Sequence, residues 1–295
     1  MNTQAAQAVE QVTREYVLTE RDFERVRKLI HEHAGIALSQ AKRDLVYSRL
    51  ARRLRALALD SFEEYLDRLE ADEANDGGEW QEFTNALTTN LTAFYREPHH
   101  FPLLAEHVER IAAGRTAMLW CSAASTGEEP YTMAMTMVEL FGSFTPPVKI
   151  LATDVDTNVL EKARWGVYPA ERVEKLPDDK AKRFFLRGKG ENAGQVRVRP
   201  ELREMILFRQ LNLLDAAWPM RGPLDVIFCR NVMIYFDKPT QIVILERFAK
   251  LLRPDGLLFA GHSESFHHAA HIFRTRGKTV YELAPVARAA AEARR

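Results

Sequence analysis

The chain has 295 residues with 41 Lys and Arg against 41 Asp and Glu, so its formal net charge is zero. A length of this order predicts one large domain or two ordinary ones. Because proteins that bind nucleic acid usually carry a cationic surface, the balanced charge argues against a broadly basic nucleic-acid-binding protein. The two cysteines exclude a disulfide-stapled scaffold, and no apolar run reaches the ~20 residues of a membrane span. We therefore expect a cytoplasmic globular protein without a signal peptide or membrane insertion.

The first eighty residues predict helices. Thr19 followed by Asp22 forms a capping-box pattern at the start of the first helix, and Gly35 is expected to end it. A second helix is predicted from residue 39 to about residue 59. A third begins near residue 60 and is broken at Asp76-Gly77-Gly78.

Charge is segregated within these helices. Residues 41–55 hold six Lys and Arg against one acid, whereas residues 60–82 hold ten acids against one base. On the second helix, a basic stripe lies beside the apolar face and consists of Lys42, Arg49, Arg52 and Arg53. The stripe is either an ordinary solvated helix surface or a docking surface for an acidic partner helix or nucleic acid.

From about residue 116 the pattern changes, because short apolar runs alternate with helical segments. The predicted strands are 118–121, 148–153, 224–228 and 257–260, and the predicted helices are 130–140, 158–164 and 240–252. This alternation predicts an α/β fold with a parallel sheet and helices on both faces. Residues 195–199 alternate polar and apolar side chains after a glycine-rich loop, which predicts a small antiparallel β insertion.

Ligands of such a sheet bind at the carboxyl ends of the strands. The first strand is followed by small residues and then by Glu128 and Glu129, with neither a dinucleotide fingerprint nor a phosphate-binding loop. The two acids favour a cationic group, although acids at a helix start also complement the helix dipole. Asp154 ends the second strand, where an acid commonly accepts from ribose hydroxyls or merely caps a helix. Together these acids indicate a ligand with a ribose and an amine but no pyrophosphate, and S-adenosylmethionine fits.

Other chemistries find little support in the sequence. The nine histidines show no cluster with metal-ligand spacing, including His99-His100, so we expect no metal. His262 follows a predicted strand, but a lone histidine there is more often structural. Ser125 and Ser263 lack the G-x-S-x-G context of a hydrolase nucleophile.

Several sequence blocks, in this order and spacing, resemble one known family. They are NLTAFYRE at 90–97, AASTGEEPY at 123–131, DVD at 154–156, FCRNVMIYF at 228–236 and PDGLLFAGHSE at 254–264. On these blocks the chain is similar to the bacterial chemotaxis receptor methyltransferases, the CheR family, over roughly residues 20–285.

The resemblance implies a Rossmann-like class I methyltransferase with an N-terminal all-helical domain and a small antiparallel β insertion. It implies a receptor-docking domain at 1–85 and a catalytic domain at 86–295, with the insertion at about 169–207 and a flexible tail at 287–295. The implied reaction transfers a methyl group from S-adenosylmethionine to glutamate side chains of transmembrane chemoreceptors. The products would be glutamate methyl esters and S-adenosylhomocysteine, made by a monomeric enzyme.

The resemblance also implies roles for individual residues. The expected cofactor-binding residues are Asn90, Thr92, Arg96, Glu129, Asp154, Asn212, Leu213, Arg230 and Asn231, with Glu128 as the alternative to Glu129. Arg96 and Tyr235 are the positions that the family associates with the reaction centre. No general base is required, because a glutamate with an unperturbed pKa of ~4.3 is already an ionised nucleophile. We therefore expect Arg96 and Tyr235 to align the substrate carboxylate with the methyl group.

The resemblance implies binding roles for two surfaces. The basic stripe becomes a plausible docking surface for acidic receptor methylation helices. The glycine-rich loop resembles that of family members that bind a C-terminal receptor pentapeptide as an added strand, and a plain hairpin turn is the alternative. The residues expected at this second surface are Arg187, Gly188, Gly190, Gly194 and Arg197. A methyltransferase of another substrate and a non-catalytic sensor of S-adenosylmethionine remain as rival interpretations.

Overall fold

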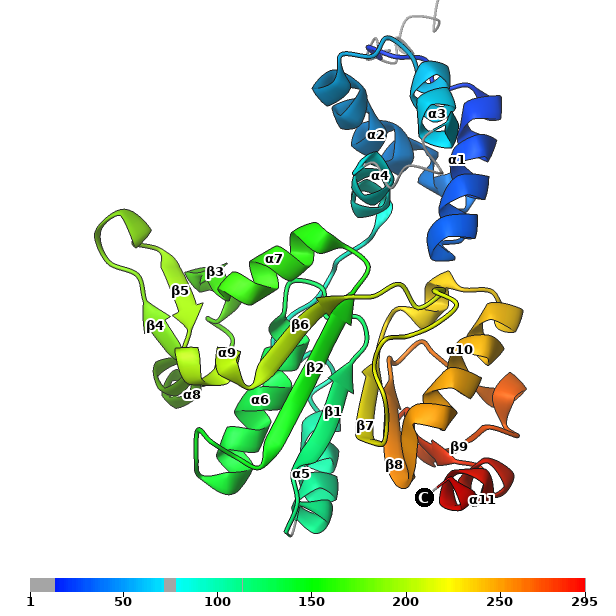
Figure 1. Cartoon of the computed structure of the whole chain (residues 1–295). Helices are drawn as coiled ribbons and strands as arrows, with labels where there is room; N and C mark the ends of the chain where they lie inside the picture. The colour runs from blue at the N-terminus through cyan, green and yellow to red at the C-terminus, as the bar shows by residue number, and fades with distance from the viewer. Residues whose placement is uncertain (1–13, 72–77, 113, 295) are drawn as a thin grey trace, which may run out of the picture. The chain divides into compact units, whose positions relative to one another are not determined.

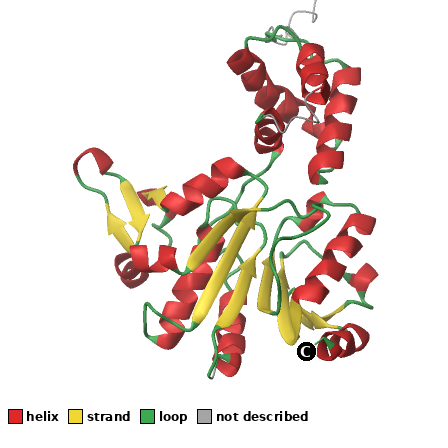
Figure 2. Cartoon of the chain, viewed as in Figure 1, coloured by secondary structure: helices red, strands yellow, loops and turns green. Residues whose placement is uncertain are grey.

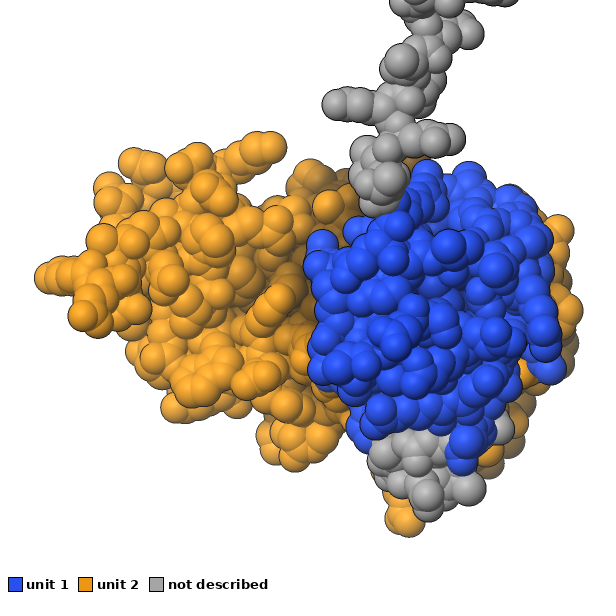
Figure 3. Space-filling model, turned by 90° about the horizontal axis from the view of Figure 1, so that it is seen from above, with its two compact units in different colours: residues 1–29, 38–87 blue, residues 30–37, 88–295 orange. Residues whose placement is uncertain are grey.

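The computed structural model describes residues 14–71, 78–112 and 114–294 (Figure 1). The chain forms two compact units, one of residues 1–29 and 38–87 and the other of residues 30–37 and 88–295 (Figure 3). No helix in the described ranges is long and apolar enough to cross a membrane. The predicted break at 76–78 lies largely outside the described residues.

The first unit is helical, as predicted. Its helices are α1 Glu20–Ala34, whose end belongs to the second unit, then the 3-10 turn η1 Gln40–Lys42, α2 Arg43–Leu57, α3 Phe62–Ala71 and α4 Glu79–Leu87. The capping box is confirmed, because the Asp22 amide donates to Thr19 Oγ1 and the Thr19 amide donates to Asp22 Oδ2, each at 3.1 Å. Gly35 has a φ of +70° and directly follows α1, so the expected helix end is also confirmed.

The second unit is built on a seven-stranded sheet with the order β6-β2-β1-β7-β8-β10-β9. In chain order the strands are β1 Ala117–Cys121, β2 Val148–Asp154, β6 Ile206–Gln210, β7 Leu224–Cys229, β8 Leu252–Ala260, β9 Phe273–Gly277 and β10 Val280–Leu283. Strands β6, β2, β1, β7 and β8 pair in parallel, which confirms the predicted parallel sheet. Strand β10 pairs antiparallel with β8 and β9, so the sheet is mixed and ends in a hairpin that the sequence reading does not include.

Helices cover both faces of this sheet (Figure 2). The helices are α5 His100–Ile111, α6 Glu128–Phe141, α7 Thr157–Trp165, α9 Pro200–Glu204, α10 Lys238–Leu251 and α11 Pro285–Ala293. Because successive strand residues point to opposite faces, Leu119 and Cys121 join the core under α5 and α6, while Trp120 joins the core under α10. Two apolar cores therefore lie on opposite faces of the sheet, and residues of the carboxyl-end loops such as Ala124 and Leu213 pack into them.

The small β insertion is confirmed as a three-stranded antiparallel sheet with the order β3-β5-β4. Its strands are β3 Val167–Pro169, β4 Phe185–Arg187 and β5 Gln195–Val198, joined through α8 Asp178–Phe184 and short 3-10 turns. Residues 287–295, for which we expect a flexible tail, are instead helical as far as Ala293 in α11. Ala291 is buried, and Arg294 donates to the Ala249 carbonyl at 3.1 Å, so this helix docks on α10.

The outermost strand of the large sheet, β9, is lined with exposed arginines. Arg274 and Arg276 alternate along it, and both form ion pairs with Glu282 on the neighbouring strand β10, at 2.5 and 3.9 Å. Phe273 is buried at its start, whereas the following residues of β9 are exposed.

Candidate functional site

The carboxyl ends of β1, β2, β7 and β8 carry the polar residues of the site. Asp154 ends β2 and is 8% exposed. Its Oδ2 accepts from the Ser125 amide at 2.7 Å and its Oδ1 accepts from the Asp156 amide at 3.0 Å. Since a carboxylate offers about four lone pairs, acceptor capacity remains for a ligand. Burial raises the pKa of Asp154 to about 6, although these amide bonds oppose the shift.

A buried cation follows β7. The Arg230 side chain is 1% exposed, and its Nη1 lies 3.0 Å from Glu129 Oε2 while its Nη2 lies 3.4 Å from Glu97 Oε2. Nη2 also donates to the carbonyl of Arg96. This one guanidinium therefore joins helix α6, the loop after β7 and the segment that leads into α5.

The two consecutive glutamates at the start of α6 have different surroundings. Glu128 is fully buried, forms an ion pair with Arg172 and accepts from Thr126 Oγ1 at 2.6 Å, so its carboxylate is satisfied within the protein. Glu129 is half-buried beside Arg230 and accepts from Cys121 Sγ at 3.2 Å. Burial raises the pKa of Glu129, and Arg230 and Arg96 oppose that rise. Of the two, Glu129 is the better placed to receive a cationic ligand.

The segment that follows α4, which belongs to the second unit, holds three of the expected cofactor residues. Asn90 Nδ2 donates to Asp156 Oδ2 at 2.8 Å, and the other oxygen of Asp156 caps the start of α7. The Thr92 carbonyl accepts from Arg172 at 3.1 Å. Arg96 Nη1 donates to the Leu91 carbonyl at 2.7 Å, which folds the segment back on itself. The segment is thus anchored to the sheet through Asp156, a residue that the sequence reading treats only as part of a motif.

The residues expected at the adenine lie just after β6. The Asn212 side chain donates to the His33 carbonyl at 2.6 Å and accepts from the Leu214 amide at 3.0 Å. Leu213 is buried against the core under α10. The Asn212 backbone amide also donates to Asp215 Oδ2 at 3.4 Å and its backbone carbonyl accepts from the Asp215 amide at 3.1 Å, so the structure uses both the side chain and the backbone of Asn212 to shape this turn.

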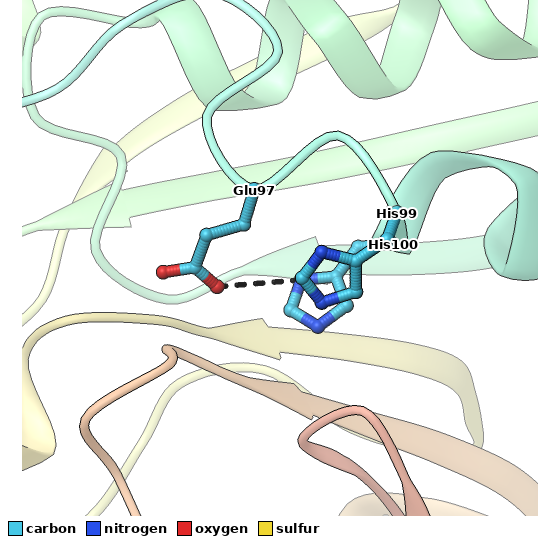
Figure 4. A group of neighbouring side chains, drawn as sticks. All are labelled: Glu97, His99 and His100. Carbon is cyan, nitrogen blue, oxygen red and sulfur yellow. Dashed lines mark ion pairs between the residues drawn. The ribbon is translucent and has the colours of Figure 1, made fainter.

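Glu97, His99 and His100 bring possible metal-ligand atoms within 4.8 Å of one another (Figure 4). His100 Nε2 lies 2.9 Å from the Lys278 carbonyl, so it carries the proton, and Nδ1 faces Glu97 Oε2 at 3.7 Å. Burial, with help from Arg230, lowers the pKa of His100 to about 4, so the ring is neutral at neutral pH. A divalent cation here would lie against the Arg230 guanidinium, and we therefore interpret the cluster as the edge of the Arg230 ion-pair network.

The basic stripe on α2 is partly used within its own unit. Arg53 pairs with Glu79 at 2.6 Å and with Glu82 at 3.3 Å, and Arg49 donates to the Ala86 carbonyl at 3.2 Å. Lys42 and Arg52 are exposed. The acidic stretch therefore neutralises part of the stripe, and the two exposed cations are the ones that a partner can reach.

The predicted peptide surface lies at the edge of the small sheet. Strand β4 ends the strand order, so one of its edges is unpaired within this sheet. Arg197 on β5 stands between Leu186 on β4 and Val167 on β3, and its guanidinium lies 5.9 Å from the ring centroid of Trp165. The glycine loop that follows β4 contains Gly188, Gly190 and Gly194, and a Cβ on Gly188 would lie 2.0 Å from the Asn192 carbonyl oxygen. The loop thus needs glycine for its tight shape.

Two carboxylates of the site were not predicted from the sequence. Glu97 contacts Arg230, and Glu264 accepts from backbone amides of the loop after β7. Both stand in the blocks at 90–97 and 254–264, and the available signal for Glu264 was an acid four residues after a predicted strand.

A parallel sheet with acids at the ends of its first two strands and no phosphate-binding loop defines a Rossmann-like methyltransferase. A comparison with known families matches "CheR methyltransferase, SAM binding domain" to residues 90–282 and "CheR methyltransferase, all-alpha domain" to residues 21–88. The chain belongs to the CheR methyltransferase family.

Curated relatives agree along most of their length. The chain is 58% identical to chemotaxis protein methyltransferase 2 of Pseudomonas aeruginosa, covering 92% of this chain and 95% of that protein. It is 52% identical to the chemotaxis protein methyltransferases of Escherichia coli and Salmonella typhimurium, covering 92% of this chain and 94% and 93% of theirs. The predicted family, cofactor and enzyme class are therefore confirmed: the chain is an S-adenosylmethionine-dependent methyltransferase of chemotaxis, in a family that methylates chemoreceptor glutamates.

The burial of Asp154 predicts a pH dependence of cofactor binding. If its ionised form accepts from the ribose, the Kd for S-adenosylhomocysteine should rise about tenfold per pH unit below the pKa of about 6. The contribution of Asp154 to folding stability should change with pH in the opposite direction to its contribution to cofactor binding. Because the folded pKa is raised above 3.8, the contribution of Asp154 is fully present below pH 3.8 and lost as pH rises through about 6.

Calorimetric titration between about pH 5 and about pH 8 measures this dependence. Asp154→Asn should bind more weakly at every pH and without the slope. A wild-type Kd that stays constant across the range would contradict the role of Asp154.

Proposed function

We propose that S-adenosylmethionine binds across the carboxyl ends of β1, β2 and β7, with Asp154 at the ribose and Glu129 at the α-amino group. The observation that carries this proposal is that a buried acid, Asp154, ends β2 while Glu129 lies half-buried beside the buried cation Arg230. An incoming amine compensates the negative charge of Glu129, while Arg230 remains paired with Glu97. Asn90, Thr92, Arg96, Asn212, Leu213 and Asn231 would complete the cofactor site.

The proposed reaction needs no proton transfer. A glutamate oxygen of the receptor attacks the methyl carbon of the sulfonium, the O–C bond forms, and the C–S bond breaks with its electron pair passing to sulfur. An anion and a cation become a neutral ester and a neutral thioether. Because both charges vanish, a site that excludes water favours the transition state. The enzyme contributes alignment of the oxygen, carbon and sulfur atoms.

Arg96 and Tyr235 are proposed to provide that alignment. Arg96 is close enough to Glu129 to lower its pKa, so it belongs to the same electrostatic environment as the cofactor amine. Tyr235 ends the 3-10 turn η4 Met233–Tyr235, in the loop that follows β7, and its side chain is half-buried. A cation and a phenol can each hold one oxygen of a carboxylate while leaving a lone pair for attack.

Tyr235→Phe tests the assignment of the reaction centre. We expect kcat for transfer of labelled methyl groups to receptor membranes to fall about tenfold, which corresponds to ~1.4 kcal/mol of lost alignment. The Kd for S-adenosylhomocysteine should stay near the wild-type value. The product should be labile to alkali, as a methyl ester is.

Tyr16→Phe in the helical unit is the matched control and should leave kcat unchanged. A Tyr235→Phe enzyme that binds the cofactor and methylates at the wild-type rate would remove Tyr235 from the reaction centre.

The helical unit is proposed to dock the receptor. Ionised methylation sites make the receptor helix acidic, and Lys42 at the end of η1 and Arg52 on α2 supply exposed positive charge. Arg49 and Arg53 support the same surface while bound to Ala86 and Glu79. The two buried thiols suit a reducing compartment, so we place the enzyme in the cytoplasm.

Charge reversal of the exposed pair tests the docking surface. Lys42→Glu with Arg52→Glu should raise KM for receptor membranes several-fold at low salt and leave kcat and cofactor affinity unchanged. Lys250→Glu, on the exposed side of α10, is the control. An unchanged KM in the double variant would rule out this surface.

A receptor tail is proposed to add as a strand to the β4 edge, with Arg187 and Arg197 near its terminal carboxylate and the glycine loop beside it. The exposed Leu186 on β4 offers apolar contact at this edge. Such a tether would raise the local concentration of the enzyme near its receptors.

Calorimetry with a receptor-tail pentapeptide measures tethering directly. We expect micromolar binding that Arg197→Ala weakens at least tenfold, and no effect of Lys250→Ala. The absence of heat at millimolar peptide would exclude the tether.

A further inference from the structure

The turn after β8 places a buried carboxylate beneath the loop that follows β7. Glu264 is 5% exposed. Its Oε2 accepts from the amides of Gly261 and of Asn231, the latter at 2.9 Å, and its Oε1 accepts from the amides of Val232 at 3.0 Å and Met233 at 2.8 Å. Four backbone N–H groups therefore converge on one side chain.

The loop depends on this acceptor. Asn231 has a φ of +58°, a left-handed conformation that asparagine adopts more readily than most residues other than glycine. The three consecutive amides from Asn231 to Met233 point to one place instead of into a strand or helix. Without the carboxylate these donors would be left unpaired in a buried setting, which is costly for the folded loop.

A second carboxylate holds the same loop from the other side. Glu97 Oε1 accepts from the His262 amide at 3.1 Å and from Asn231 Nδ2 at 3.4 Å. The approach is close, because a Cβ on Gly261 would lie 2.3 Å from Asn231 Nδ2. The β7 and β8 loops are therefore fixed to each other, with Asn231 between the two acids.

Tyr235 lies two residues after Met233, the last residue whose amide donates to Glu264. The Tyr235 amide donates to the Val232 carbonyl at 3.1 Å, and the next amide donates to the Met233 carbonyl at 3.1 Å. The 3-10 turn that carries the phenol thus starts at residues whose N–H groups are fixed by Glu264.

We propose that Glu264 is a positioning residue for methyl transfer, which sets the orientation of the Tyr235 phenol through the backbone of residues 231–233. This inference rests on the role of Tyr235 in the proposed function. Glu264 itself faces backbone amides, so it acts through Tyr235.

Glu264→Gln is the decisive variant. The glutamine side chain has the size of the glutamate, but its NH₂ group is a donor. It would face two of the four backbone N–H groups, which are donors as well. With both substrates saturating, we expect kcat to fall at least tenfold. Asp225→Asn is the matched control, because Asp225 is 1% exposed and also accepts a backbone amide, from Met118 at 2.8 Å, but at the opposite end of β7. It should lower Tm while leaving kcat within about twofold of wild type.

A double-mutant cycle separates positioning from general destabilisation. If Glu264 acts through the phenol, Glu264→Gln combined with Tyr235→Phe should be only slightly slower than the slower single variant. A double variant with the full product of both losses would overturn the proposal, as would Glu264→Gln with wild-type kcat.

If the proposed role of Tyr235 is itself wrong, the Tyr235→Phe enzyme methylates at the wild-type rate. That result differs from both outcomes that would overturn the role of Glu264. Should Glu264→Gln not fold, Glu264→Asp takes its place in the same cycle. The aspartate retains the charge and reaches fewer of the amides, so its loss of kcat should be smaller but equally dependent on Tyr235.

Discussion

The site depends on one buried charge. Removing a guanidinium from water is costly unless opposite charges accompany it, and Arg230 receives two of them from different parts of the chain. Glu97 comes from the segment before α5 and Glu129 from the start of α6, so the cation forces both to meet beside β7. The same guanidinium also binds the Arg96 carbonyl, which brings the proposed reaction centre to the place where the cofactor amine is expected. Loss of this cation would leave the carboxylates of Glu97 and Glu129 near each other without a compensating charge.

The local pattern of the sequence predicts most of the fold. Alternating apolar strands and amphipathic helices give the parallel sheet, because a strand buried on both faces leaves a continuous apolar run. The hairpin β9–β10 is absent from that reading, since β9 has one buried residue followed by exposed arginines. Helix α11 was also not predicted, because an alanine-rich end is typical of a fraying tail. In the structure Ala291 packs into the core under α10 and fixes the helix there. Both elements are defined by what they pack against and only weakly by their own composition.

The residues of the candidate site also differ in whether the local sequence predicts them. Glu129 and Asp154 are visible in the sequence because the end of a predicted strand is a local property. Glu97 and Glu264 gain their meaning from partners far along the chain, 165 residues away for the His262 amide in the case of Glu97. The basic stripe shows the converse, since its charges are evident in the sequence but the ion pair of Arg53 with Glu79 is not. Composition reveals which charges exist, and only the fold reveals which of them are already neutralised.

The outer strands β9 and β4 of the two sheets differ in the side chains that they expose. Along β9, Arg274 and Arg276 project beside the unpaired backbone, and bringing a second such strand alongside would set like charges against each other. The edge at β4 exposes one apolar side chain, Leu186, beside a single arginine, Arg187, and a glycine loop follows it. The other outer strands are β6 in the large sheet and β3 in the small one. Strand β4 has three residues, Phe185–Arg187, so it offers few backbone hydrogen bonds to any strand added beside it. Side-chain contacts would then decide which sequences pair with this edge.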